Sequence, residues 1–309
     1  MAGGDLMLIQ DVQSYLAVRR AMGFELHSEG TLLQSFAKYS SALGKNYICA
    51  EVAIQWAGVA RTVTTRARRL GQVIRLASFL RAEDHRHEIP PAMFGPEKGP
   101  RPVPYIFSAE NLRRLVQAAF ELGRRNPFRG QTYGTFFALL ACTGLRVSEA
   151  IRLRFNDVTA DGLIIRCSKF RKSRLVPLHS TAQVGLERYL GKRRPFAPFD
   201  DHVFVSLRRR PLLVADAETA FRSAAERIGL KREPGRPRPT IHALRHTFAV
   251  RSLENCPDGR DRITRHMLGL STYLGHSKVA DTYWYLEATP QLMRGIADTS
   301  QVFFSGGRQ

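Results

Sequence analysis

The chain has 309 residues, 44% of them hydrophobic, which is enough for two domains with packed cores. Its formal net charge of +20 predicts an anionic partner, with nucleic acid as the first candidate. It has no run of about 18 apolar residues, which argues against a membrane span, and its four cysteines lie too far apart for zinc-binding pairs.

Four segments near the start carry apolar residues at helical spacing and predict a four-helix unit: 8–22, 31–43, 51–60 and 62–82. The last segment interleaves its apolar stripe with five arginines, which form either a solvated face or a set of phosphate contacts. Residues 90–104 then contain six prolines and two glycines. Proline interrupts helices and strand ladders, so this stretch predicts a boundary between domains and a semi-rigid linker.

A second domain is expected from residue 105 onward, with Ser108 as the cap of its first helix. A buried helix over 131–142 should end at Gly144, and two strands, 162–167 and 174–178, should flank a basic hairpin. A short strand is expected at 203–205. Further helices are expected at 181–190, 215–229, 240–254, 262–270 and 291–297. The predicted fold is mainly α, with an α+β second domain that contains a small antiparallel sheet.

The charge is concentrated in this second part of the chain. Residues 1–100 contain 12 basic and 9 acidic residues, whereas residues 101–309 contain 35 and 18. A solvated basic face is one explanation, but so large an excess favours phosphate binding by the second domain. The cysteines suit reduced thiols, and no signal peptide is visible at 1–8, which together predict a cytoplasmic protein.

Two short motifs pair an arginine with a second functional side chain three residues away. Arg146 precedes Glu149, and His242 precedes Arg245. At this spacing the members of each pair share a helix face, where a plain surface pair is the simplest explanation. His242 and His246 also have a spacing that binds zinc, but the chain lacks the HExxH glutamate, and Arg245 would place a positive charge beside the metal.

The stretch Leu274–Tyr285 contains a histidine, His276, and a tyrosine nine residues later. A tyrosine near a histidine and a basic surface can act as a nucleophile, whereas aromatic packing is the ordinary alternative. Tyr283 is a rival nucleophile by composition. One continuous helix would place His276 and Tyr285 on opposite faces, so a break is expected between them, with Ser277 as a cap.

These residues supply what the cleavage of a phosphodiester requires without a metal. The reaction needs a nucleophile, donors for the non-bridging oxygens and an acid for the leaving oxygen. Arginine suits the second task because its fork matches phosphate oxygens and stays charged. A lysine whose pKa is lowered by nearby arginines and burial suits the third.

In combination, Thr-Gly-Leu-Arg-x-x-Glu, His-x-x-Arg, Leu-Gly-His and the tyrosine nine residues later resemble the tyrosine recombinases of the phage-integrase and Xer type. The resemblance implies a SAM-like helical core-binding domain (1–89), the linker (90–104) and a catalytic domain (105–309) with a C-terminal tail that packs on a neighbouring protomer. By this resemblance, Arg146 and Arg245 bind the scissile phosphate, and His276 donates a further hydrogen bond to it. Tyr285 is the nucleophile, His242 accepts its proton, and Lys169 is the acid that protonates the leaving oxygen. Glu149 is the supporting carboxylate.

The chain departs from the family pattern at three places. Phe170 follows Lys169 where a glycine is usual, which makes Lys172 the alternative lysine. The 31 residues from Arg245 to His276 are several more than in compact members, so the loop with Cys256 should contain an insertion. No arm-binding domain is expected before the helical unit, which resembles the simpler recombinases. The segment around Tyr285 also resembles recombinases encoded by transposons or integrative elements.

The sequence therefore predicts a site-specific recombinase that cuts and rejoins DNA through a 3′-phosphotyrosyl intermediate. We expect integration, excision or transposition of a mobile element. The partner should be double-stranded DNA clamped between the two domains, with four protomers on two sites, alone or together with related recombinases. No metal, cofactor, membrane or small-molecule substrate is expected. The alternatives are relaxation of DNA like a type IB topoisomerase and a non-catalytic DNA-binding protein of the same fold.

Overall fold

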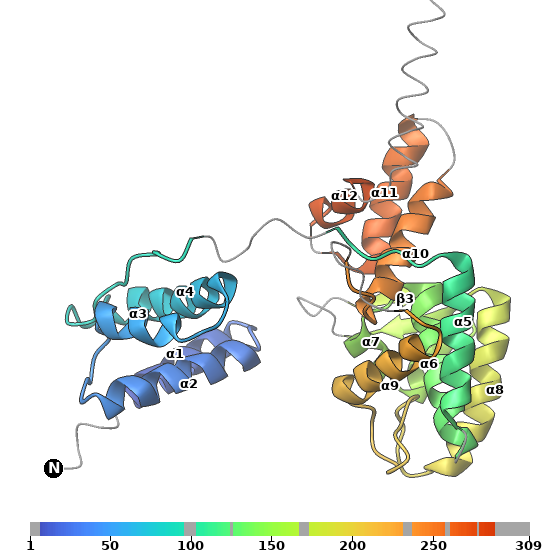
Figure 1. Cartoon of the computed structure of the whole chain (residues 1–309), viewed down its shortest axis with the longest axis horizontal. Helices are drawn as coiled ribbons and strands as arrows, with labels where there is room; N and C mark the ends of the chain where they lie inside the picture. The colour runs from blue at the N-terminus through green and yellow to red at the C-terminus, as the bar shows by residue number, and fades with distance from the viewer. Residues whose placement is uncertain are drawn as a thin grey trace, which may run out of the picture. The chain divides into compact units, whose positions relative to one another are not determined.

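The computed structural model describes residues 7–95, 103–123, 126–166, 173–230, 237–256, 260–276 and 278–287, without the side chains of residues 260, 261 and 263. The chain divides into two compact units, Met1–Arg101 and Pro102–Gln309 (Figure 1). The predicted cap Ser277 and the predicted helix 291–297 lie outside the described residues. No helix in the described ranges is long and apolar enough to cross a membrane.

The first unit is built from four helices: α1 (Met7–Ala21), α2 (His27–Ala42), α3 (Ala50–Gly58) and α4 (Val63–Leu80). Helix α1 packs on α2, and α3 packs on α4, in two layers (Figure 1). The layers enclose an apolar core in which the rings of Phe36 and Trp56 lie 5.4 Å apart. Thr62 caps α4 by accepting a hydrogen bond from the backbone of Thr65. The four predicted helices are confirmed, with small shifts at their ends.

The second unit contains most of the helices and the sheet. Its helices are α5 (Ala109–Phe120), η1 (Glu121–Gly123), α6 (Pro127–Thr143), α7 (Val147–Ile151), η2 (Phe155–Asp157), α8 (Ser180–Phe196), α9 (Val214–Arg227), α10 (His242–Glu254), α11 (Arg260–Leu274) and α12 (Ala280–Glu287). Ser108 caps α5 as predicted. Helix α6 buries most of its residues because α5, α8 and α10 pack around it.

Gly144 ends α6 as predicted, in the left-handed conformation with φ of 61°. A β-carbon there would lie 2.5 Å from the ring of Phe248 on α10, so no other residue fits without a shift of the packing. The turn therefore places Arg146, two residues later, near the N-terminal end of α10.

The sheet has three antiparallel strands in the order β1 (Val158–Thr159), β2 (Gly162–Ile165) and β3 (Arg174–Val176). The two predicted strands are confirmed as β2 and β3, and Ile165 pairs with Arg174 at the end of the pairing. The expectation of a third strand at 203–205 was wrong: this buried segment forms only isolated bridges, such as Val205 with Pro211. The fold class is thus mainly α with a small antiparallel sheet.

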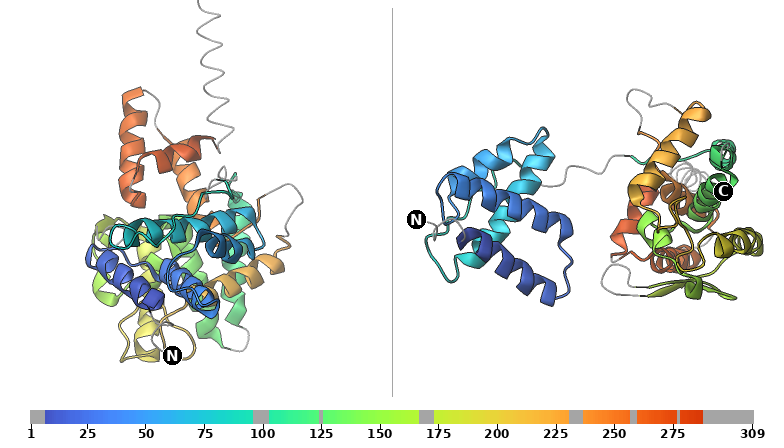
Figure 2. Two further views of the ribbon diagram at one scale, coloured as in Figure 1. Left: turned by 90° about the vertical axis from the view of Figure 1, so that its left-hand side faces the viewer. Right: turned by 90° about the horizontal axis from the view of Figure 1, so that it is seen from below.

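The end of the second unit is formed by α10, α11 and α12, and Figure 2 shows α12 beside the other two helices. Their contact surfaces share an apolar core that contains Val250, Leu253, Leu270 and Tyr285. The expected break between His276 and Tyr285 is confirmed, because α11 ends at Leu274, where Gly275 adopts a φ of 66°, and α12 begins only at Ala280, after His276. This turn reverses the chain and lays α12 against α10.

Candidate active site

Three arginines from distant parts of the second unit converge on the last carbonyls of α11. The bonds are Arg174 Nε to Tyr273 O at 2.7 Å, Arg245 Nη2 to Leu274 O at 2.8 Å and Arg146 Nη2 to Gly275 O at 3.0 Å. The final carbonyls of a helix have no partner within it, and they carry the negative end of its dipole. The C-terminal end of α11 therefore attracts positive charge, and the three arginines lie close together there.

Arg245 is the most deeply buried of these cations, with 2% of its surface exposed. Its Nη1 donates to Gly144 O at 2.7 Å and its Nη2 to Leu274 O, so the α6 turn and the α11 end position the guanidinium together. Burial, and next the charge of Arg146, lowers the pKa of Arg245 to about 10. The group thus remains cationic near neutral pH, and these two bonds use only two of its five N–H donors.

The carboxylate of Glu149 connects two of these arginines, Arg174 and Arg146. Its carboxylate accepts two hydrogen bonds from Arg174, at 3.1 and 2.9 Å, and one from Arg146 Nη1 at 2.8 Å. It also accepts the backbone N–H of Arg146 at 3.0 Å, which fixes the start of α7. Burial raises the pKa of Glu149, but the hydrogen bonds and charges of Arg174 and Arg146 outweigh it, so the pKa lies below its ordinary value.

We predict that Glu149→Gln lowers the stability of the folded protein by about 3 kcal/mol at pH 7, since it leaves a buried arginine uncompensated. Because the folded pKa is lowered, the stabilisation is present above the ordinary glutamate value of about 4.3 and is lost as pH falls through the folded pKa. Thermal unfolding measured from pH 7 to pH 3 should show the difference between wild type and variant shrinking on the acid side.

The matched control is Glu110→Gln, because Glu110 pairs with Arg113 on an exposed face of α5. That change should leave the unfolding temperature nearly unaltered at every pH. A constant difference between Glu149→Gln and wild type down to pH 3 would contradict the role given to the carboxylate charge.

Tyr285 lies on α12 with 3% of its surface exposed, whereas Tyr283 is 52% exposed. The Tyr285 hydroxyl lies 3.1 Å from Nδ1 of His246 on α10, and the ring of His276 stacks on the tyrosine ring with centroids 6.1 Å apart. The charge of Arg245 also interacts with Tyr285. The structure therefore brings together five of the predicted site residues: Arg146, Glu149, Arg245, His276 and Tyr285.

His242 is the first residue of α10 and is exposed on the protein surface. Desolvation of its ring, followed by the charges of Arg245 and Arg146, lowers its pKa. Its ring packs edge-on against His246 with centroids 4.5 Å apart. Lys169 and the alternative Lys172 lie outside the described residues, so the choice of lysine stays a prediction.

Arg174 and His246 contribute to this site, although neither was among the catalytic residues predicted from the sequence. Arg174 is two residues before the fully buried Val176 in β3, so strand alternation places it on the inner face. An arginine on an inner face needs a partner, which was the available signal. His246 was considered only as a zinc ligand, although its helical spacing from His242 already put both rings on one face of α10.

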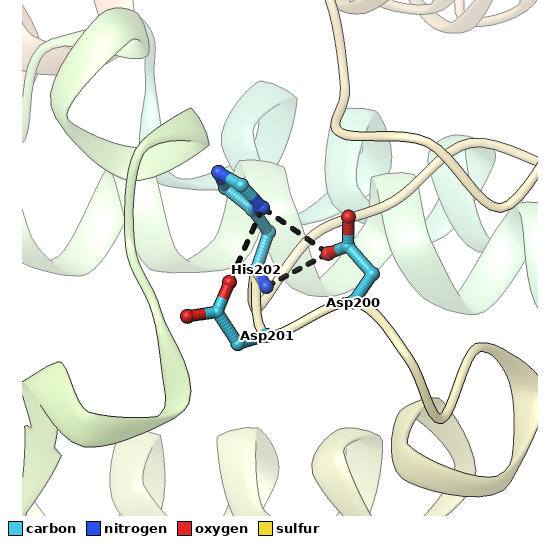
Figure 3. Close-up of side chains that lie close together, drawn as sticks. All are labelled: Asp200, Asp201 and His202. Carbon is cyan, nitrogen blue, oxygen red and sulfur yellow. Dashed lines mark hydrogen bonds and ion pairs between the residues drawn. The ribbon is translucent and has the colours of Figure 1, made fainter.

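A second cluster of polar side chains lies outside this site, at Asp200, Asp201 and His202 (Figure 3). Within the described ranges, these three residues can offer metal-ligand atoms within 4.8 Å of one another. Arginines already neutralise both carboxylates: Arg193 donates to Asp200 at 3.1 Å, and Arg154 donates to Asp201 at 2.8 Å. The two aspartates thus hold the loop after α8 in place through Arg193 and Arg154.

Comparison with known proteins places this arrangement in a family. Residues 106–291, more than half of the chain, match the model of the phage integrase family. The chain belongs to the phage integrase family. A protein of Sinorhizobium fredii named as an integrase/recombinase, y4rB, is 37% identical over 92% of this chain and 94% of its own length. The class of enzyme is therefore a tyrosine-type site-specific recombinase, and neither alternative function is favoured.

Solved structures of family members share the fold. XerH recombinase bound to its palindromic difH substrate, in a post-cleavage complex, matches with a TM-score of 0.65 at 18% identity over 89% of this chain and 80% of that one. The lambda integrase tetramer bound to a Holliday junction matches with a TM-score of 0.63 at 16% identity over 90% and 76%. At these identities the likeness establishes the fold of the phage integrase family and no finer property.

Proposed function

We propose that this protein cuts and rejoins double-stranded DNA at specific sites by means of Tyr285, Arg146 and Arg245. One observation carries the proposal. The Tyr285 hydroxyl lies against His246 of α10, and its charge interacts with that of the buried Arg245. Arg245 and Arg146 both donate hydrogen bonds to backbone carbonyls at the C-terminal end of α11. A phenol beside two fixed guanidinium groups is suited to attack a phosphate, because the cations neutralise the charge that develops on the non-bridging oxygens.

In the proposed reaction, the Tyr285 oxygen attacks a DNA phosphorus and the bond to the 5′ oxygen breaks. A 3′-phosphotyrosine and a free 5′ hydroxyl result, and Lys169 supplies the proton to the leaving oxygen. His276 donates a hydrogen bond to a non-bridging oxygen. The phosphotyrosyl bond conserves the energy of the phosphodiester, so a 5′ hydroxyl from a partner duplex reverses the step without ATP.

The first unit is proposed to hold DNA around the cleavage site. Arg68 and Arg75 are exposed and seven residues apart on α4, which places them on one face of the helix, and Arg61 is exposed just before its N-terminus. Their charge adds to the basic excess of residues 101–309. In this proposal residues 1–89 bind the core site, 90–104 link the domains, 105–309 cleave, and the C-terminal tail couples four cytoplasmic protomers on two sites of a mobile element.

A nicked substrate tests the function. The duplex would carry an end sequence of the DNA element that encodes the protein, with a nick beside the scissile phosphate so that the short fragment with the free 5′ hydroxyl diffuses away after attack. Wild-type protein should accumulate as a covalent adduct that survives denaturant, and intact site pairs should yield exchanged strands. Binding without any adduct would contradict the proposal. Adduct formation with relaxation of plasmids that lack the site would favour a topoisomerase instead.

A further inference from the structure

The nucleophile candidate has a hydrogen-bond partner that differs from the one expected. Nδ1 of His246 lies 3.1 Å from the Tyr285 hydroxyl, within normal hydrogen-bond distance. The family resemblance gives the tyrosine proton to His242, one helical turn earlier on α10. Because both histidines lie on one face of α10, the sequence alone does not distinguish them, and the distance from Tyr285 does.

The packing around His246 fixes the direction of its ring. The ring of His246 forms T-shaped contacts with the rings of His242 and Trp284, at centroid distances of 4.5 and 5.3 Å. Its centroid lies 5.6 Å from that of Tyr285, which is itself buried among α10, α11 and α12. These contacts aim Nδ1 at the phenol before DNA is present, so the interaction is part of the folded protein.

His276, the other imidazole beside Tyr285, is oriented by a different bond. Its Nδ1 lies 2.7 Å from the Thr282 hydroxyl on α12, while its ring stacks on the tyrosine. The planes of the two rings are nearly parallel, at 18°, and the bond to Thr282 fixes the direction of Nδ1 of His276. This arrangement suits a phosphate contact for His276, whereas Nδ1 of His246 lies at hydrogen-bond distance from the Tyr285 hydroxyl.

We propose that His246 is a catalytic residue that accepts the proton of Tyr285 as the tyrosine attacks DNA. The proposal rests on the proposed function. As the bond from Tyr285 Oη to phosphorus forms and the bond to the 5′ oxygen breaks, the phenolic proton moves to Nδ1 of His246. The leaving oxygen takes its proton from the separate acid. Neutral His246 with its proton on Nε2 is the tautomer that can do this.

Several ionisable groups lie near the pair of His246 and Tyr285 and belong to the same pH response: His242 and Arg245 on α10, His276 after α11, and Arg146 through its charge on His242 and Arg245. A pH profile of wild type alone would therefore not single out His246. Each histidine must be replaced in turn to show which one causes the pH dependence of the rate that is due to the proton acceptor.

The test is the single-turnover rate of adduct formation on the nicked substrate between pH 5 and 9. Asparagine can place an amide oxygen near the position of Nδ1, so His246→Asn keeps a hydrogen-bond acceptor but cannot take up a proton. We expect wild type to show a rate that rises with pH as the proton acceptor becomes neutral, and we expect His246→Asn to lose this limb and to react about 100-fold more slowly or worse. His246→Ala should fall further, because it also loses the alignment of the hydroxyl.

His242→Asn and His179→Asn are the matched comparisons. His179 caps α8 through its side chain, and asparagine is also a good cap, so that variant should keep the wild-type rate and profile. Thermal unfolding and DNA binding of each variant separate loss of fold from loss of chemistry. If His242→Asn alone loses the limb while His246→Asn matches wild type, the proposal is wrong.

A substrate with sulfur in place of the bridging 5′ oxygen separates the two proton transfers. A thiolate leaves without protonation, so this substrate should restore a variant that lacks the acid and should not restore His246→Asn. Restoration of His246→Asn by the sulfur substrate would overturn the role as proton acceptor. Failure of wild type to form any adduct would instead count against the proposed function itself.

Discussion

Replacing Tyr285 by phenylalanine is expected to abolish the covalent protein–DNA adduct while DNA binding stays at the wild-type level. The change removes only the hydroxyl, so the ring still packs among α10, α11 and α12 and beside His276. Without the nucleophilic oxygen no phosphotyrosine can form, and the adduct rate should fall by more than about 10⁴-fold, as for nucleophile losses in other enzymes. The nicked substrate and a denaturing gel measure the adduct, and a binding titration measures affinity.

Tyr283→Phe is the control, because Tyr283 lies two residues earlier on α12 and is half exposed. It should form adduct at the wild-type rate. The reverse outcome, with adduct lost in Tyr283→Phe and kept in Tyr285→Phe, would move the nucleophile to the exposed residue. It would also remove the basis for the role of His246, since that histidine contacts the hydroxyl of Tyr285.

The second large effect on the rate of adduct formation is expected for Arg245→Lys, which keeps the positive charge but removes the planar pair of guanidinium donors. The guanidinium of Arg245 bonds Gly144 O and Leu274 O at the same time, and a lysine ammonium lacks the planar geometry to do so while facing a phosphate. Loss of one such donor costs about 10²–10³-fold in other enzymes, so we expect adduct formation to slow at least that much. Affinity for DNA should change far less, because many other basic residues contribute to it.

Arg251→Lys provides the comparison on the same helix. Arg251 also donates to a backbone carbonyl, that of Phe107, but it takes no part in the arginine cluster at the end of α11. Its replacement should leave the rate of adduct formation unchanged. Equal losses in the two variants would mean that an arginine on α10 matters only for stability, and a wild-type rate in Arg245→Lys would show that the fork is dispensable.

The sequence by itself determined the helical elements and the local geometry of the motifs. Apolar periodicity located α1–α6 and α9–α11 to within about four residues and found α8 six residues short at its end, since each helix buries at least one stripe of side chains. Gly144 marked the turn before Arg146, and the nine-residue spacing required a break after His276, which the start of α12 at Ala280 provides. These features depend on neighbours within about one helical turn, which a sequence displays directly.

The tertiary structure alone decided which side chains meet. Arg146 and Gly275 are 129 positions apart, and Arg245 and Gly144 are 101 apart, so no local spacing predicts that they bond. The end of α11 selects its arginines because its carbonyls lack partners within the helix and its dipole favours cations. Likewise, His242 and His246 occupy one face of α10, and only the docking of α12 places the Tyr285 hydroxyl against His246.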